Sequence, residues 1–262
     1  MQDLAFFQRK TAGLLALARR EIAPIAVVLA VGAFLLMFRN IAEEVGEGDT
    51  HAFDTTIIYA LRVPGHPGTP IGPAWLTTAL TDVTSLGSIT VLSILVLLVF
   101  GLILSLGRVR EACVLLVASV GGMLLTMLLK DVFQRDRPPL VLHLVPAVNG
   151  SFPSGHATLS ATVYLTLGAL IAHFAQRPRV RVYALTAAVL LAITVGCSRV
   201  YLGVHWPTDV LAGWCVGSAW ALVCWSVALL WERLAGLRLT TAPVKEAAPQ
   251  DGADAGVLSE GA

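Results

Sequence analysis

Three short polar segments lie at the ends of strongly apolar stretches, and they hold most of the residues in this chain that could do chemistry. They are Lys130–Pro138, Pro153–His156 and Ser198–Asp209. Together they supply cations, imidazoles and a carboxylate, namely Lys130, Arg137, Arg199, His156, His205 and Asp209. Because fixed cations hold phosphoryl oxygens and a histidine can accept a phosphoryl group, this set suits binding a phosphate and transferring it to a histidine.

The third segment places a histidine and a carboxylate at helical spacing. His205 and Asp209 are four positions apart, and Pro207 between them suits the first turn of a helix, where its missing N–H costs nothing. Residues at this spacing face the same way. A carboxylate bound to one imidazole nitrogen fixes the tautomer and leaves the other nitrogen free to attack. The same carboxylate stabilises the cation that forms when this nitrogen bonds to phosphorus.

The second segment indicates a helix start that can bind an anion. Pro153-Ser154-Gly155-His156 precedes an apolar run without a gap. Ser154 can cap the helix, and Gly155 lets a backbone approach closely. Free N–H groups and the positive end of the helix dipole then form an anion pocket without a metal. His156 lies on the first turn and can face this pocket, although a lone histidine there is more often structural.

The first segment carries cations at the end of an apolar run. Lys130 ends the run, and Arg137 follows before Pro138, which fixes the chain direction. A Lys or Arg at such a place can extend to the lipid headgroups, and we interpret Arg135 in this way. The presence of the other two segments favours phosphate binding for Lys130 and Arg137. Arginine is preferred where a phosphate is held by paired hydrogen bonds.

The composition indicates an integral membrane protein. Of the 262 residues, 56% are hydrophobic and 13% are charged, whereas soluble domains carry about 25% charged residues. A spanning helix needs about 20 mainly apolar residues. We therefore predict an all-α, polytopic fold with six transmembrane helices, at roughly 22–39, 87–106, 111–129, 157–175, 182–199 and 210–231.

The remaining segments complete the predicted organisation. Residues 1–21 form an N-terminal segment, 22–231 the six-helix membrane domain, and 232–262 a largely disordered tail. Residues 54–86 hold apolar clusters too short to cross a bilayer, interrupted by prolines, and we predict two short helices on the outer membrane surface. Asp82 within this segment is expected to cap a helix rather than contact a substrate.

Two glycines in the last predicted span favour close helix packing. Gly213 and Gly217 form a G-x-x-x-G pattern. Such a pattern can form a dimer face, but in a chain with several spans it more often packs against another span of the same chain. We therefore expect an intramolecular contact.

The distribution of Lys and Arg predicts the orientation. Twelve of the 18 lie on the side shared with the N-terminus, and six lie on the other. Since cytoplasmic loops carry the excess of these residues, both termini are expected in the cytoplasm. The three polar segments then open on the opposite side, the periplasmic or extracellular face if the location is a bacterial inner membrane.

Several classes of cofactor and partner are disfavoured. The four cysteines show no C-x-x-C spacing, so neither a disulfide framework nor a zinc site is predicted. No carboxylate cluster suits Mg²⁺, and we predict metal-independent turnover without a cofactor. The net charge of +1 gives no argument for nucleic acid as a partner, and no obligate protein partner is evident.

The three segments carry a family resemblance. Lys130-x6-Arg137-Pro138, Pro153-Ser154-Gly155-His156 and Ser198-Arg199-x5-His205-x3-Asp209 resemble the three-part motif of the type 2 phosphatidic acid phosphatases (PAP2). This superfamily, also called the lipid phosphate phosphatases, includes the vanadium haloperoxidases. All three parts match without substitution and in the expected order. The resemblance covers roughly residues 22–231 and points to the integral membrane branch, with a PAP2/haloperoxidase-like helical core.

The resemblance implies a role for each motif residue. His205 is expected to be the nucleophile that forms a phosphohistidine, with Asp209 orienting it. His156 is expected to act as the general acid on the leaving oxygen. The remaining motif residues are expected to bind the phosphoryl oxygens, namely Lys130, Arg137, Arg199, Ser154 and Gly155.

The expected activity is hydrolysis of a membrane lipid phosphate or pyrophosphate. Undecaprenyl pyrophosphate, phosphatidate, phosphatidylglycerol phosphate and lipid A phosphate all place a phosphate at the headgroup plane, and a polyprenyl pyrophosphate or a broad specificity is favoured. A phosphotransferase with a second lipid as acceptor uses the same residues. A transporter for phosphorylated lipids would not need the histidines, and a vanadate-dependent oxidase is disfavoured by the spans.

Overall fold

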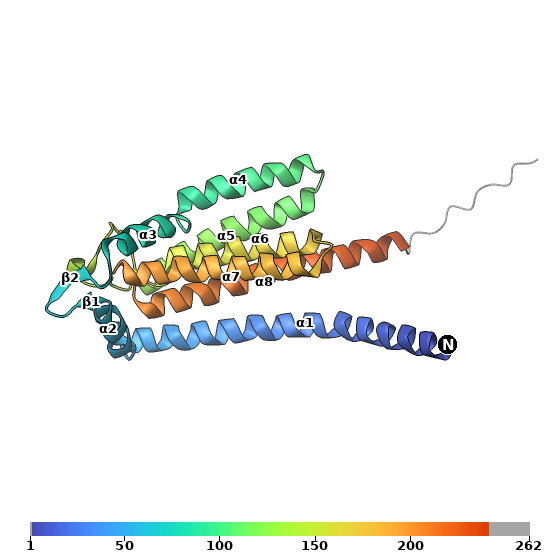
Figure 1. Ribbon diagram of the computed structural model, residues 1–262, viewed down its shortest axis with the longest axis horizontal. Coiled ribbons are helices and arrows are strands. Elements are labelled where there is room, and N and C mark those ends of the chain that lie inside the picture. Colours follow the sequence, from blue (N-terminus) through green and yellow to red (C-terminus); the bar gives the residue numbers. More distant parts are fainter. Residues whose placement is uncertain (1, 241–262) are drawn as a thin grey trace, which may run out of the picture.

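The computed structural model describes residues 2–240, and the side chains of residues 24–231. Within this part the protein is a bundle of long helices (Figure 1). The helices are α1 (Gln2–Glu47), α2 (His51–Ala60), α3 (Ala74–Ser85), α4 (Ile89–Ser105), α5 (Val109–Phe133), η1 (Leu140–Leu142), α6 (Gly155–Phe174), α7 (Pro178–Tyr201) and α8 (Pro207–Thr240). The predicted all-α class is confirmed, whereas the predicted disorder beyond about Thr240 lies outside the described residues.

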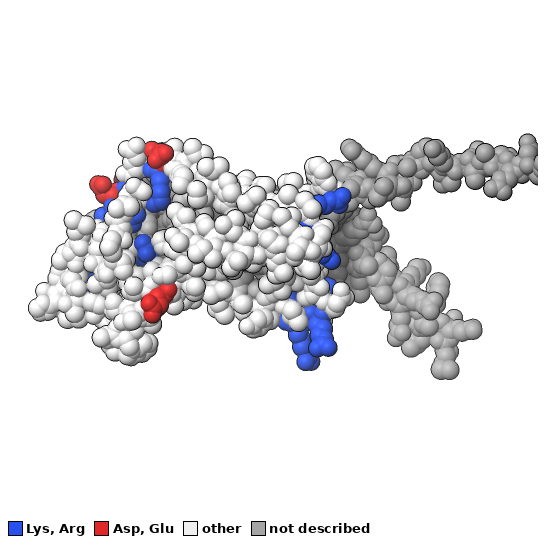
Figure 2. Space-filling view, turned by 90° about the horizontal axis from the view of Figure 1, so that it is seen from above, with Lys and Arg blue, Asp and Glu red and all other residues white. Residues whose placement is uncertain are grey.

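The helices provide five or six membrane spans. Five are long and apolar enough to cross a bilayer, namely Pro24–Glu47, Val109–Phe133, Gly155–Phe174, Pro178–Tyr201 and Pro207–Trp231. A sixth arises if α3 and α4, which meet at a bend of 49°, are taken as one broken span. Each predicted span overlaps one of these helices. On the face shown in Figure 2, charged side chains gather at the two ends and leave an uncharged band between them.

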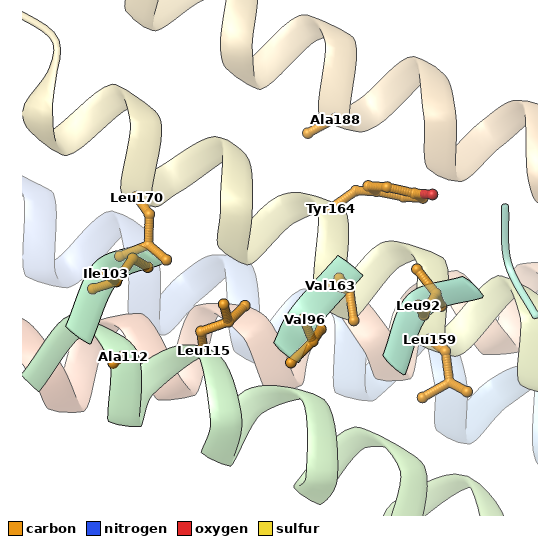
Figure 3. Packing of buried hydrophobic residues seen from close by; sticks show 10 residues of the cluster. All are labelled: Leu92, Val96, Ile103, Ala112, Leu115, Leu159, Val163, Tyr164, Leu170 and Ala188. Carbon is orange, nitrogen blue, oxygen red and sulfur yellow. The ribbon is translucent and has the colours of Figure 1, made fainter. Parts of the chain in front are cut away.

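The apolar core is centred on α6. Its buried side chains meet those of α4, α5 and α7 in one cluster, drawn in Figure 3, which contains Leu92, Val96, Ile103, Ala112, Leu115, Leu159, Val163, Tyr164, Leu170 and Ala188. Helix α6 also packs closely along α8. Because α6 begins at the second polar segment and α8 at the third, this core fixes the two segments relative to each other.

Small residues bring α8 against α6. A Cβ atom added at Gly213 would lie 2.8 Å from the carbonyl oxygen of Ser154 and 2.9 Å from the Cβ of Ala157. A Cβ at Gly217 would lie 2.9 Å from the Cβ of Ala161. The G-x-x-x-G pattern therefore packs within the chain, which confirms the prediction of an intramolecular contact.

Residues 51–86 form two short helices, as predicted, with an unpredicted hairpin between them. Strands β1 (Arg62–Val63) and β2 (His66–Pro70) pair in antiparallel fashion. The expected capping role of Asp82 is wrong, because this residue lies inside α3. The cap of α4 is Ser88, whose hydroxyl oxygen accepts a hydrogen bond from the Val91 N–H at 3.3 Å.

The turn from α7 into α8 depends on a glycine. Gly203 has φ +74°, a backbone conformation that other residues rarely adopt. A side chain here would collide with the carbonyl oxygen of Leu142 and the guanidinium of Arg62, which are themselves hydrogen-bonded at 2.8 Å. The tight turn leads the chain directly to His205.

Candidate active site

The three polar segments meet at one end of the bundle. Helices α5 and α7 end there, and α6 and α8 begin there (Figure 1). They enclose a cavity of about 350 Å³. The predicted site residues that line it are Lys130, Arg137, Gly155, His156, Arg199 and His205. The other two, Ser154 and Asp209, are fully buried beside it, and the Ser154 N–H donates to the Asp209 carbonyl oxygen at 2.9 Å.

His205 and Asp209 form a buried pair. The Nδ1 atom of His205 lies 3.4 Å from Oδ2 of Asp209, and its Nε2 atom lies 3.2 Å from Nη1 of Arg137. Since a guanidinium can only donate, Nε2 must accept that hydrogen bond, and the imidazole proton is assigned to Nδ1, facing the carboxylate. The lone pair of Nε2 therefore points into the cavity, towards Arg137.

The surroundings keep the imidazole neutral. Burial lowers the pKa of His205 from its ordinary value of 6.5 to about 3. Asp209 raises this pKa, whereas Arg137 and Arg199 lower it further. Desolvation opposes the charged form most strongly, so the ring carries no charge near neutral pH and is available as a nucleophile.

Two of the predicted phosphate-binding side chains keep an unpartnered donor. Arg199 donates from Nη1 to the hydroxyl of Thr84 at 3.0 Å, but its buried Nε has no acceptor. The buried hydroxyl of Ser154 also has no partner. Ser154 occupies the N-cap position of α6 without a side-chain cap, so the expected capping by its hydroxyl is wrong. Buried donors of this kind are normally satisfied, and a phosphoryl oxygen would satisfy both.

The other two cations organise the loop before α6. Lys130 donates from Nζ to the carbonyl oxygen of Gly150. Arg137 donates to the carbonyl oxygens of Asn149, Val148 and Val204 at 3.0, 2.8 and 2.6 Å. Burial lowers the pKa of Arg137, while Asp209 raises it. Arg137 therefore ties the loop to the turn that carries His205, in addition to lining the cavity.

Two further residues contact Asp209 through their side chains, and neither was predicted as a site residue. The hydroxyl of Ser151 donates to its Oδ2 atom. Arg135 lies 2.6 Å from its Oδ1 atom and 2.7 Å from Oδ2 of Asp54. The interpretation of Arg135 as a residue extending to the headgroups is wrong. Its side chain is only 15% exposed and forms ion pairs with both Asp54 and Asp209.

The cavity continues in two directions. An apolar groove of about 190 Å³ between α4 and α5 shares Ile89, Met123 and Leu159 with it. A polar cavity of about 660 Å³ shares Lys130 and Arg137 with it on another side. The cations thus lie between an apolar groove and a polar opening, which is the arrangement that an amphiphile with a phosphate headgroup needs.

In residues 24–231, no group of three or more His, Cys, Asp or Glu side chains is arranged to hold a metal ion. The four cysteines are free thiols in the structure. The hydrogen-bond donors around the cavity are the guanidinium groups of Arg137 and Arg199, the ammonium of Lys130 and the hydroxyl of Ser154, all of which can bind the oxygens of an anion. The chemistry of the described side chains therefore suits a phosphate group.

Comparisons with known proteins agree with this geometry. The family model of the PAP2 superfamily matches residues 111–233. The chain is 34% identical to phosphatidylglycerophosphatase B of Bacillus subtilis over 146 residues, which are 55% of this chain and 70% of that protein. It is 35% identical to an undecaprenyl-diphosphatase of Sulfolobus acidocaldarius over 126 residues, 46% of this chain and 57% of that protein.

The fold also matches a solved structure. The crystal structure of a transmembrane PAP2-type phosphatidylglycerolphosphate phosphatase from Bacillus subtilis superposes with a TM-score of 0.69 at 27% identity. The match covers 76% of this chain and 96% of that one. With the family model placed over the three polar segments and a relative matched over most of its length, this chain belongs to the PAP2 superfamily.

Proposed function

We propose that this protein is a membrane phosphatase that hydrolyses a lipid phosphate or pyrophosphate through a phosphohistidine intermediate. The observation that carries this proposal is the buried, neutral His205, whose unprotonated Nε2 atom faces Arg137 in a cavity that Lys130 and Arg199 also line. A nucleophile, a set of phosphate-binding cations and a second histidine share one space. Phosphoryl transfer depends on such positioning and charge stabilisation.

In the proposed reaction, Nε2 of His205 attacks phosphorus, and the bond from phosphorus to the leaving oxygen breaks. His156 donates a proton to that oxygen. The Nδ1 proton stays on the ring, which becomes cationic and is stabilised by Asp209. Water then attacks the phosphohistidine, its proton passes to His156, and inorganic phosphate leaves with His205 neutral again. The cations and the Ser154 hydroxyl hold the phosphoryl oxygens throughout.

A lipid substrate is supported by the apolar groove that continues the cavity between α4 and α5. A headgroup phosphate can reach the cations while its hydrocarbon stays within the bundle's apolar band. The relatives named above act on phosphatidylglycerophosphate and undecaprenyl diphosphate. For this chain we propose a polyprenyl pyrophosphate or a range of lipid phosphates as substrates.

The proposal is tested by phosphate release from the purified protein in detergent. The substrates are undecaprenyl pyrophosphate, phosphatidate, phosphatidylglycerol phosphate and lipid A phosphate. We expect wild-type protein to release phosphate and His205→Ala to lose at least about 1,000-fold in kcat, because the nucleophile is gone. The matched control is His66→Ala in the hairpin, which leaves the cavity untouched. Near-normal turnover by a folded His205→Ala variant would exclude the mechanism.

The same assay separates the rival functions. Addition of EDTA is expected to leave phosphate release unchanged, because we propose that the cations of the protein bind the phosphate. Loss of turnover in EDTA and its return with Mg²⁺ would contradict metal independence. A lipid transporter would bind the four lipids without releasing phosphate from any of them. A phosphotransferase would release no inorganic phosphate and would instead transfer the phosphoryl group to an added acceptor lipid.

A further inference from the structure

A buried chain of charges joins α2 to the candidate nucleophile. Asp54 on α2, Arg135 after α5 and Asp209 on α8 are linked through the two Nη atoms of the arginine, at 2.7 and 2.6 Å. Both carboxylates are completely buried. Breaking such a pair would leave an uncompensated buried charge, which is strongly unfavourable. The chain of charges is therefore a fixed part of this end of the protein.

Arg135 determines how the Asp209 carboxylate is presented to His205. Its Nη1 atom holds Oδ1, so that Oδ2 is left to face the imidazole Nδ1. Oδ2 also accepts the N–H of Trp206 at 2.9 Å and the hydroxyl of Ser151. With both oxygens held, the carboxylate cannot rotate away from the ring.

Asp54 in turn holds Arg135 and the start of α8. Its Oδ2 atom accepts from Arg135, and from the Thr208 hydroxyl at 2.7 Å. Its Oδ1 atom accepts the N–H of Thr208 at 3.0 Å, which is one of the free N–H groups at the α8 N-terminus. The three linked groups, two carboxylates and one guanidinium, sum to one net negative charge on the Nδ1 side of the imidazole, opposite the Arg137 guanidinium on the Nε2 side. This charge suits a ring that becomes cationic when it is phosphorylated.

We propose that Arg135 and Asp54 are positioning residues for the nucleophile, acting on His205 through Asp209, and that α2 is thereby part of the active site. The inference rests on the proposed phosphatase function. A purely structural pair would tie α2 to α8 without affecting the chemical step. A positioning pair must affect the rate at which phosphorus is attacked.

The test compares Arg135→Gln, Arg135→Lys and Asp54→Asn with wild type in phosphate release. We expect Arg135→Gln to lower kcat about 10- to 100-fold with KM changed less than about 3-fold, because a misplaced nucleophile slows the chemical step and not binding. Arg135→Lys should recover part of kcat, because it restores the cation with fewer hydrogen bonds. In a single turnover, formation of the acid-labile phosphohistidine should slow by the same factor.

Matched controls remove the same charges from exposed positions at the same end. Arg39→Gln on α1 and Asp49→Asn before α2 replace exposed side chains. Both are expected to keep kcat within about 2-fold, because neither side chain contacts Asp54, Arg135 or Asp209. The Asp54→Asn/Arg135→Gln double variant should lose less than the product of the single losses, since both residues act through one contact.

The inference is overturned if folded Arg135→Gln keeps the wild-type kcat, or if its loss is confined to KM. It is also overturned if Arg135→Lys is as impaired as Arg135→Gln while equally stable. If Arg135→Gln does not fold, the same criterion of a loss in kcat with little change in KM is applied to Asp54→Asn, because asparagine keeps the size of the side chain. Failure of the proposed function is distinct, since wild type and Arg39→Gln would then release no phosphate.

Discussion

The imidazole of His205, our proposed nucleophile, lies between two opposing surroundings. Burial and the nearby arginines disfavour its charged form, whereas Asp209 lies 3.4 Å from Nδ1 and favours that form. A buried histidine without the carboxylate would stay neutral but could not support the cation formed on phosphorylation. An exposed pair would be partly protonated below pH 6.5. In the proposed reaction, this combination keeps the ring neutral before phosphorylation and stabilises the cationic ring that phosphorylation forms.

This environment predicts a loss of stability in acid. The folded pKa of about 3 lies below the value of 6.5 for an unfolded histidine, so between these values the unfolded chain binds a proton that the folded protein does not. The contribution of His205 is fully present above pH 6.5 and falls as the pH falls towards 3. At pH 5 the loss is about 2 kcal/mol.

The measurement is the thermal midpoint in detergent at pH 7 and pH 5, for wild type and His205→Asn. From pH 7 to pH 5, the thermal midpoint of wild type is expected to fall further than that of His205→Asn, because the variant lacks the imidazole that titrates. His143, whose pKa burial also lowers, is present in both proteins and cancels. Equal falls in the two proteins would show that His205 is not held neutral by the fold.

Residue types and spacing predicted the motif residues but not their support. His205 and Asp209 are four positions apart, and a helical turn was enough to pair them. Asp54 and Arg135 are 81 positions apart and contact each other only because α2 folds over the start of α8. Ser151 stands two residues before the second motif and carries no signal of its own. Contacts between distant segments need the tertiary structure.

At the scale of helices, the packing of α6 on α8 fixes the geometry of the site. Helix α6 carries His156 and α8 carries Asp209, and small residues let the two backbones approach. Without a strong hydrophobic force between helices in a bilayer, such close packing is a main source of association. A shift along this interface would separate the two histidines.

We predict that Gly217→Leu destabilises the protein and that Gly101→Leu does not. At Gly217 an added Cβ already collides with α6, whereas at Gly101 on α4 nothing lies within 4 Å. Overpacking typically costs about 1 to 3 kcal/mol. The measurement is the fraction of monodisperse protein that remains after heating, followed by size-exclusion chromatography. Equal survival of the two variants would contradict tight α6–α8 packing, and a change in oligomeric state alone would point to a dimer face.

Hydropathy predicted the spans well because each apolar run is long enough to cross a bilayer. It could not predict the hairpin of Arg62–Val63 and His66–Pro70, since strands of this length have no periodic pattern. It also missed the start of α1 at Gln2 and the 49° bend at which α3 meets α4. Helix ends in these regions are set by turns and by contacts with neighbouring segments rather than by hydropathy.

At the scale of the whole molecule, the two ends differ in charge. On the face seen in Figure 2, the end with the site shows both signs, and the other end shows Lys and Arg alone. The described basic residues at that other end are Arg108, Arg110, Arg177, Arg179 and Arg181. An excess of such residues marks cytoplasmic loops. We therefore propose that the site opens on the periplasmic or extracellular face and that both termini are cytoplasmic.

This orientation predicts opposite labelling of two engineered cysteines. In a variant whose four native cysteines are replaced by alanine, His66→Cys lies in the hairpin at the site end, and Arg177→Cys lies in the α6–α7 turn at the other. Both positions are exposed. In intact bacterial cells a membrane-impermeant maleimide should label His66→Cys alone, and after permeabilisation it should label both. Labelling of Arg177→Cys alone in intact cells would contradict the proposed orientation and show that the opposite one holds. The substrate's phosphate would then have to be reached from the cytoplasm, although the chemistry at His205 would be unchanged.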